Sequence, residues 1–96
     1  MKHYIIVKFK PEVTREQQSK MLPDIAALFG HLIWVDGITN VDICQNCVER
    51  DNRYDLMIEI EMEKDALENY DNCIWHKLWK EKYDKLLAQK TIFDRE

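Results

Sequence analysis

The segment 54–62 alternates between two kinds of side chain along its whole length. Its even positions are the apolar residues Tyr54, Leu56, Ile58, Ile60 and Met62, and its odd positions are Asp55, Met57, Glu59 and Glu61. Successive side chains of a β-strand point to opposite faces of a sheet, so this alternation predicts a strand that is buried on one face. The chain must therefore fold into a sheet whose inner face is covered by other elements.

The segment 2–10 predicts a second strand of the same type. It is rich in β-branched and aromatic residues and is closed by Pro11. Its two faces would carry His3, Ile5, Val7 and Phe9 on one side, and Tyr4 and Ile6 on the other. Weaker strand patterns occupy 38–47 and 90–95, and the polar run 49–53 indicates a loop.

Three helices are expected over 15–34, 64–70 and 74–88. A capping box of Thr14 and Gln17 would begin the first helix, Pro23 should bend it, and Asp36-Gly37 ends the segment. The last helix carries an apolar stripe of Trp75, Leu78, Trp79, Tyr83, Leu86 and Leu87.

The resulting order, β-α-β-β-α-α-β, predicts an α+β fold. It matches a ferredoxin-like unit, in which helices cover one face of a four-stranded antiparallel sheet. The other face would expose Tyr4, Ile6 and Met57, bordered by Lys8, Glu59 and Glu61. Two such faces packed together would bury this patch, so we expect a homodimer formed through the open sheet face.

The length of 96 residues predicts a single domain over 1–96, small enough to benefit from a partner. The basic residues are scattered among acidic ones, which argues against nucleic-acid binding. No apolar run suits a signal peptide or a membrane span, and the three cysteines suggest reduced thiols in a cytoplasmic protein. We expect no cofactor, because the two glycines form no phosphate-binding loop.

Candidate acid/base chemistry centres on Tyr70 and His76, with His3 on the strand beneath. The imidazole of His76 suits a general base near neutral pH, Tyr70 could donate a hydrogen bond to an enolate oxygen, and His3 could orient a substrate carbonyl. The alternatives are that His76 contacts a ligand without catalysing a reaction, or that His76 and Tyr70 are packing residues. Aromatic residues could line a cavity for an aromatic or acyl ligand, or simply pack in the core: Phe29, Trp34, Trp75, Trp79 and Tyr83. The residues that we expect to contact the ligand are Phe29, Leu56, Trp75 and Trp79.

A zinc site is a further alternative. Cys44 and Cys47 form a C-x2-C pair, and Cys73 and His76 form a C-x2-H pair, which together offer four ligands for tetrahedral zinc. On a strand, however, positions 44 and 47 point to opposite faces, so they would converge only if the chain turns there. We therefore favour an organic ligand and no metal.

The chain also resembles the stress-responsive A/B barrel domains over essentially its whole length. Four segments carry the resemblance: the run from His3 to Lys10 followed by Thr14, Arg53-Tyr54-Asp55-Leu56, Tyr70 followed by His76, and Ile92-Phe93-Asp94. Each motif is loose, and their order and spacing are what make the match.

The resemblance implies a dimeric α+β barrel with a site between the helices and the sheet of each subunit. A few members cyclise polyketide-like chains by aldol chemistry, and in those the counterparts of His76, Tyr70 and His3 line the pocket. This chain has Leu56 where such cyclases can present another imidazole, and Cys44 where glycine is usual. The resulting hypothesis is a homodimer that binds a small, partly apolar molecule, with polyketide-cyclase-like enolate chemistry; the alternative is a noncatalytic stress-response or structural dimer module.

Overall fold

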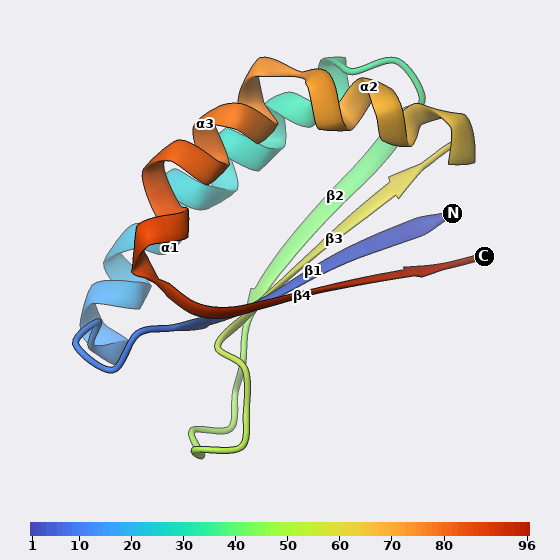
Figure 1. The fold of residues 1–96 in the computed structure, drawn as a ribbon. Helices are drawn as coiled ribbons and strands as arrows, with labels where there is room; N and C mark the ends of the chain where they lie inside the picture. The colour runs from blue at the N-terminus through green and yellow to red at the C-terminus, as the bar shows by residue number, and fades with distance from the viewer.

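The computed structural model, which describes residues 1–96, contains four antiparallel strands in the sheet order β2-β3-β1-β4 (Figure 1). The strands are β1 (Lys2–Phe9), β2 (Ile38–Gln45), β3 (Leu56–Met62) and β4 (Leu87–Arg95). β1 is central and pairs with β3 on one side and with β4 on the other. β4 and β2 are therefore the two edge strands of the sheet.

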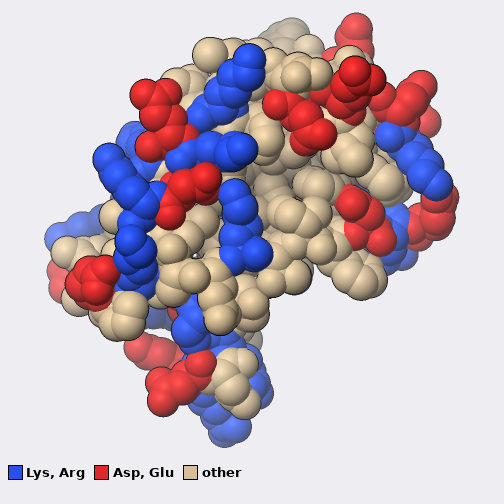
Figure 2. Space-filling model, in the orientation of Figure 1, with Lys and Arg blue, Asp and Glu red and all other residues tan.

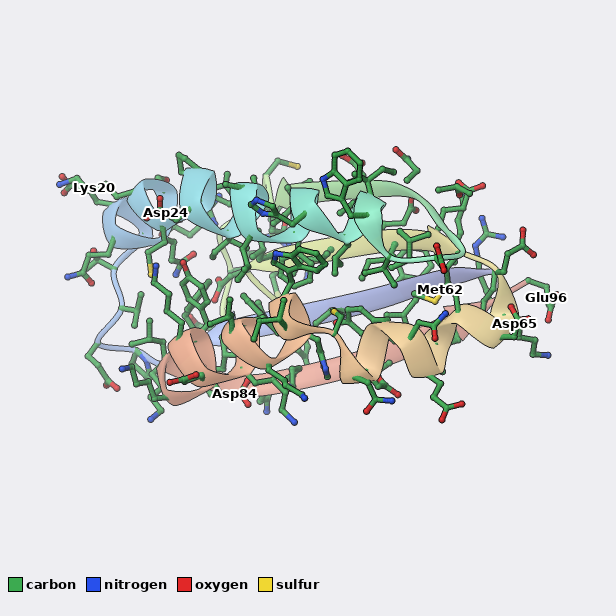
Figure 3. All side chains as sticks on the ribbon, turned by 90° about the horizontal axis from the view of Figure 1, so that it is seen from above. Lys20, Asp24, Met62, Asp65, Asp84 and Glu96 are labelled. Carbon is green, nitrogen blue, oxygen red and sulfur yellow. The ribbon has the colours of Figure 1, made fainter.

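The helices are α1 (Arg15–Gly30), α2 (Leu67–Asn72) and α3 (Ile74–Tyr83), with short 3₁₀ turns at His31–Trp34, Lys64–Ala66 and Asp84–Leu86. All of them cover the same face of the sheet (Figure 1). Seen from above, α1 lies beside α2 and α3 across the strands (Figure 3). This confirms the predicted β-α-β-β-α-α-β order and ferredoxin-like α+β class. None of the helices combines the length and the hydrophobicity that crossing a lipid bilayer requires.

Side chains cap the starts of α1 and α3. Thr14 and Gln17 form the predicted reciprocal capping box at α1. The thiol of Cys73 accepts a hydrogen bond from the backbone N–H of His76 at the start of α3. Cys73 itself has an extended backbone, with φ −76° and ψ 157°. This non-helical residue separates α2 from α3 and changes the direction of the chain between Tyr70 and His76.

The prediction of a single helix over 74–88 is wrong at its carboxyl end. Leu86 and Leu87 have helical spacing from Tyr83, but α3 ends at Tyr83 and Leu87 already belongs to β4. Lys10 donates its backbone N–H to the carbonyl of Leu86 at 2.9 Å, and Leu87 is paired with Phe9 in the sheet. These contacts give the backbone groups of Leu86 and Leu87 hydrogen-bond partners, so the chain forms a strand here although the spacing of its apolar residues suits a helix. Smaller differences are that α1 ends in a 3₁₀ turn after Gly30, and that β2 and β3 are shorter than predicted.

The core lies between the helices and the inner face of the sheet. β1 and β3 alternate in burial along their whole lengths, which places their predicted apolar faces inside. Ile25 and Phe29 of α1 and Trp79 and Tyr83 of α3 cover this face. The rings of Phe29 and Trp79 pack edge to face, with centroids 5.0 Å apart.

The outer face of the sheet has no helix over it (Figure 1). Tyr4, Ile6 and Met57 lie on this face, as predicted, since they alternate with the buried positions of β1 and β3. The strand register adds Phe93, which is 59% exposed and is paired with Tyr4. These side chains form an apolar patch across the centre of the uncovered face. Lys2, which forms an ion pair with Glu59, borders the patch at one end, and Lys8 borders it at the other.

Candidate functional site

A cleft of about 300 Å³ lies between the helices α2 and α3 above and the strands β1 and β4 below. The sheet contributes His3, Lys90 and Asp94 to its polar lining, and the helices contribute Tyr70, Asp71, His76 and Lys80. Ile5, Leu67, Trp79 and Ile92 form its apolar walls. The space-filling view shows a hollow between the helices and β4, with both basic and acidic side chains around it (Figure 2).

The fold brings together the three residues that the sequence proposed as catalytic. His3 belongs to the inward face of β1, and Tyr70 lies on α2 directly above it, with ring centroids 5.4 Å apart. The extended backbone at Cys73 brings the first turn of α3 back onto α2, so the centroid of the His76 ring lies 4.5 Å from that of the Tyr70 ring. The phenol is therefore placed between two imidazoles.

The Tyr70 hydroxyl is buried and has no hydrogen-bond partner in the protein. Its side chain is only 2% exposed, and burial raises the pKa of Tyr70 above its ordinary value, with smaller contributions from Cys73 and Asp71. The phenol consequently stays protonated across the physiological pH range. It can donate a hydrogen bond, and nothing in the protein accepts one from it.

The imidazole of His76 is oriented by the main chain of α2. Its Nδ1 lies 3.0 Å from the backbone carbonyl oxygen of Asp71. A carbonyl oxygen can only accept, so in the neutral imidazole Nδ1 carries the proton and Nε2 holds the lone pair. His76 is half-buried at the cleft and can thus take up a proton through Nε2.

His3 is held by a residue that the sequence reasoning did not select, Asp94 of β4. His3 is 5% exposed, and its Nδ1 is hydrogen-bonded to Oδ1 of Asp94. The alternation of Ile92, Phe93 and Asp94 could have placed Asp94 on the inner face. Its pairing with His3 depends on the register of β4 against β1, which no local pattern contains.

Of the residues expected to bind a ligand, only Trp79 lines this cleft. Phe29 packs against the edge of Trp79 and supports that wall without reaching the cleft. Trp75 stacks on His31, with ring centroids 5.7 Å apart and an interplanar angle of 9°. Leu56 does not line the cleft either. It lies on β3 four positions from Ile60, the residue paired with His3, and four positions correspond to roughly 13 Å along the strand.

The four side chains of the zinc alternative do not assemble. No three or more His, Cys, Asp or Glu side chains are grouped so that they could hold a metal ion. Cys44 and Cys47 line a separate hollow with Ile6 and Met57 at the outer face of the sheet, and Cys73 caps α3. Burial, with the nearby Asp42 and Glu59, raises the pKa of Cys44.

Comparison with known families matches residues 1–96 to the stress responsive A/B barrel domain. No curated protein matches the chain significantly.

Several solved structures share the fold at low sequence identity. A dimeric protein of unknown function with a ferredoxin-like fold from Bacteroides fragilis has a TM-score of 0.82 and 14% identity, over 99% of this chain and 93% of its own. A Dabb family protein from Mesorhizobium loti has a TM-score of 0.74 and 12% identity, over 99% and 93%. The hydroxynitrile lyase of Passiflora edulis has a TM-score of 0.70 and 10% identity, over 96% and 87%. At these identities the likeness supports the fold alone.

Proposed function

This chain belongs to the stress responsive A/B barrel domain family, and we propose that it binds a small, partly apolar carbonyl compound in the cleft at His3, Tyr70 and His76 and moves a proton on it. The observation that carries the proposal is the buried Tyr70 hydroxyl, which has no protein partner and lies between two imidazoles. An unpaired buried polar group costs roughly 1–3 kcal/mol, so a bound oxygen atom that accepts its hydrogen bond gains that energy back.

In this proposal each of the three side chains has a separate role. Nε2 of His76 takes a proton from the carbon next to the carbonyl group. The electron pair of the broken C–H bond forms the C=C bond of the enolate, and the π pair of the C=O bond moves to the carbonyl oxygen. Tyr70 stabilises that oxygen by donating its hydrogen bond, since burial raises the pKa of the phenol and keeps it protonated. Asp94 holds His3 in one orientation, so that its other ring nitrogen is directed at the substrate.

The walls of the cleft match a substrate that is partly apolar. Ile5, Leu67, Trp79 and Ile92 surround the polar groups, and the space of about 300 Å³ is at the lower end of small-molecule sites. The hydroxynitrile lyase among the similar structures is an enzyme, which supports the view that this fold can carry catalysis. A noncatalytic dimer module is the alternative, and it predicts a filled interior beside His76 in place of this cleft.

We also propose that the protein is a homodimer formed through the outer face of the sheet. Ile6, Met57 and Phe93 lie on this uncovered face, and a partner would remove them from water. The Bacteroides fragilis structure is described as dimeric, which supports the proposal. The cleft lies on the opposite, helix-covered face, so it would stay accessible in such a dimer.

Proton transfer can be tested without knowing the natural substrate. A panel of small aliphatic and aryl methyl ketones is incubated with the protein in D2O, and exchange of the protons next to the carbonyl is followed by NMR. The wild type should accelerate exchange of at least one ketone. His76→Ala should lower that rate by about 100-fold or more, because a positioned base contributes at least this much.

His31 provides the matched control, because it stacks on Trp75 outside the cleft. His31→Ala should exchange like the wild type, and both variants should keep the wild-type circular dichroism spectrum and molecular mass. If His76→Ala and His31→Ala exchange at the same rate, His76 is not the base. If the wild type accelerates exchange of no ketone, the noncatalytic alternative replaces the proposal.

A further inference from the structure

We propose that the end of the cleft at Lys80 and Lys90 is an anion subsite, and that the ligand is a small oxo acid whose carboxylate binds there while its carbonyl group reaches Tyr70 and His76. This rests on the site of the proposed function and adds the chemical class of its ligand. We call α2 and α3 the roof of the cleft and β1 and β4 its floor. The observation that carries the proposal is that the charged side chains of the roof and of the floor change from acidic to basic in the same direction along the cleft.

The side chains that the helices contribute to the cleft change from acidic to basic along the chain. Asp71 lies at the end of α2, His76 is in the first turn of α3, and Lys80 follows one helical turn later. Residues four apart on a helix share a face, so His76 and Lys80 both point into the cleft. Lys80 is in none of the five ion pairs of the structure, so its charge is available to a ligand.

The floor repeats this order on β4. Asp94, Ile92 and Lys90 alternate along the strand and share its inner face, and all three line the cleft. β4 runs back beneath α3, so Lys90 lies at the same end as Lys80 and Asp94 lies at the far end. Figure 3 shows this axis: Asp84 marks the junction between α3 and β4, and Asp65 and Glu96 mark the opposite end.

The two ends of the cleft therefore select different ligand groups. At one end lie Lys80, which has no ion-pair partner, and Lys90, whose Nζ lies 3.1 Å from Oδ1 of Asp84. This leaves one net positive charge to attract an anion. At the other end, Asp71 and Asp94 would repel an anion.

The separation of His76 and Lys80 along α3 guides the choice of a probe. Lys80 follows His76 by a rise of about 6 Å, close to the span of an extended chain of four or five carbon–carbon bonds. A carboxylate bound at Lys80 would thus place a ketone four bonds away beside His76. The apolar walls Ile5, Trp79 and Ile92 suit the methylene groups between them. This geometry favours an acid such as 5-oxohexanoate, which serves as the probe.

The test compares 5-oxohexanoate with its methyl ester, which has the same chain and no charge. Both are titrated into the full-length protein, and binding is followed from the amide resonances of α3 and β4 and the indole resonance of Trp79. The acid should bind more tightly than the ester. Lys80→Gln should weaken binding of the acid roughly fivefold and leave that of the ester unchanged, because a partly exposed ion pair contributes about this much.

Lys77→Gln is the matched control. Lys77 is on the same helix and its substitution removes the same charge, but it does not line the cleft. Added salt should also weaken binding of the acid more than that of the ester. The anion subsite is overturned if acid and ester bind equally, if Lys80→Gln and Lys77→Gln have the same effect, or if the acid shifts no cleft resonance up to its solubility limit. The ketone-exchange experiment is independent of these outcomes, so the proposed function can stand or fall separately.

Discussion

His3 and Asp94 form an imidazole–carboxylate pair across β1 and β4, with the imidazole buried, although 91 positions separate them in the sequence. The side chain of His3 is 6% exposed, while that of Asp94 is 39% exposed at the edge strand. The pair joins the first strand to the last at the floor of the cleft. It therefore links the stability of the sheet edge to the orientation of a site residue.

Removal of Asp94 should cost more than removal of a carboxylate from a surface ion pair. Asp94→Ala leaves the buried imidazole of His3 without its partner, and we expect a loss of about 1–2 kcal/mol in the free energy of unfolding. Asp84→Ala, which breaks the exposed pair with Lys90, should cost less than about 1 kcal/mol. Urea denaturation of both variants measures the difference. Equal losses would show that burial of His3 does not make its pair stronger.

Loss of the Tyr70 hydroxyl should stabilise the protein and impair its site. The hydroxyl is buried without a partner, so Tyr70→Phe removes a desolvated polar group and should raise the free energy of unfolding by about 1 kcal/mol. Ketone exchange should fall in the same variant. Tyr54→Phe is the control, since the Tyr54 hydroxyl lies 3.0 Å from Oγ1 of Thr91 and its loss should not stabilise. A destabilised Tyr70→Phe protein would mean that this hydroxyl has a partner in solution.

The raised pKa of Tyr70 predicts a loss of stability at high pH. Above pH 10, the ordinary value for tyrosine, the unfolded chain releases this proton while the native protein retains it. The unfolded state then binds fewer protons, so the free energy of unfolding falls as pH rises, by up to about 1.4 kcal/mol per pH unit for this group. Denaturation between pH 9 and about pH 11 should show a shallower decline for Tyr70→Phe than for the wild type. Parallel declines would contradict the assignment to Tyr70.

The two glycines should respond to alanine in opposite directions. Gly37 has φ +91°, and a Cβ there would lie 2.6 Å from the Cβ of Ala66, so Gly37→Ala should destabilise the protein by about 2 kcal/mol or more. Gly30 ends α1, and a Cβ at that position meets no atom within 4 Å. Gly30→Ala should therefore be neutral or stabilise by up to about 1 kcal/mol. Thermal unfolding of both variants provides the comparison, and a tolerated alanine at position 37 would contradict this packing of Ala66.

The proposed dimer predicts a charge-sensitive outer face. Ile6 lies at the centre of that face, so Ile6→Asp should convert the dimer to monomers in light scattering coupled to size exclusion. Ile74 is 57% exposed on α3, in the helical layer, and Ile74→Asp should leave the mass of the dimer unchanged. Dissociation by Ile74→Asp alone would place the interface on the helices. A monomeric wild type would remove the dimer proposal altogether.

Most of the fold could be predicted because the patterns that specify it are local. The alternation in β1 and β3 placed Ile5, Val7 and Ile58 inside and Tyr4 and Met57 outside, as the structure has them. Thr14 likewise marked the start of α1 through a contact within one helical turn. The end of α3 was missed, because Leu86 and Leu87 satisfy the spacing of a helix as well as the start of a strand. Pairing of Leu87 with Phe9 resolves that ambiguity, and it is a contact between distant parts of the chain.

The candidate site divides in the same way. Alternation along a strand is a property of the local backbone, so the inward position of His3 could be read from its neighbours. Which side chains meet there depends on strand register and on the angle between α2 and α3, and a periodic pattern contains neither. The sheet register brings Asp94 to His3, and the turn at Cys73 brings His76 to Tyr70. The same long-range packing leaves Leu56 and Phe29 outside the cleft and adds Lys80 and Lys90 to it, because these relationships arise only when the elements are packed together.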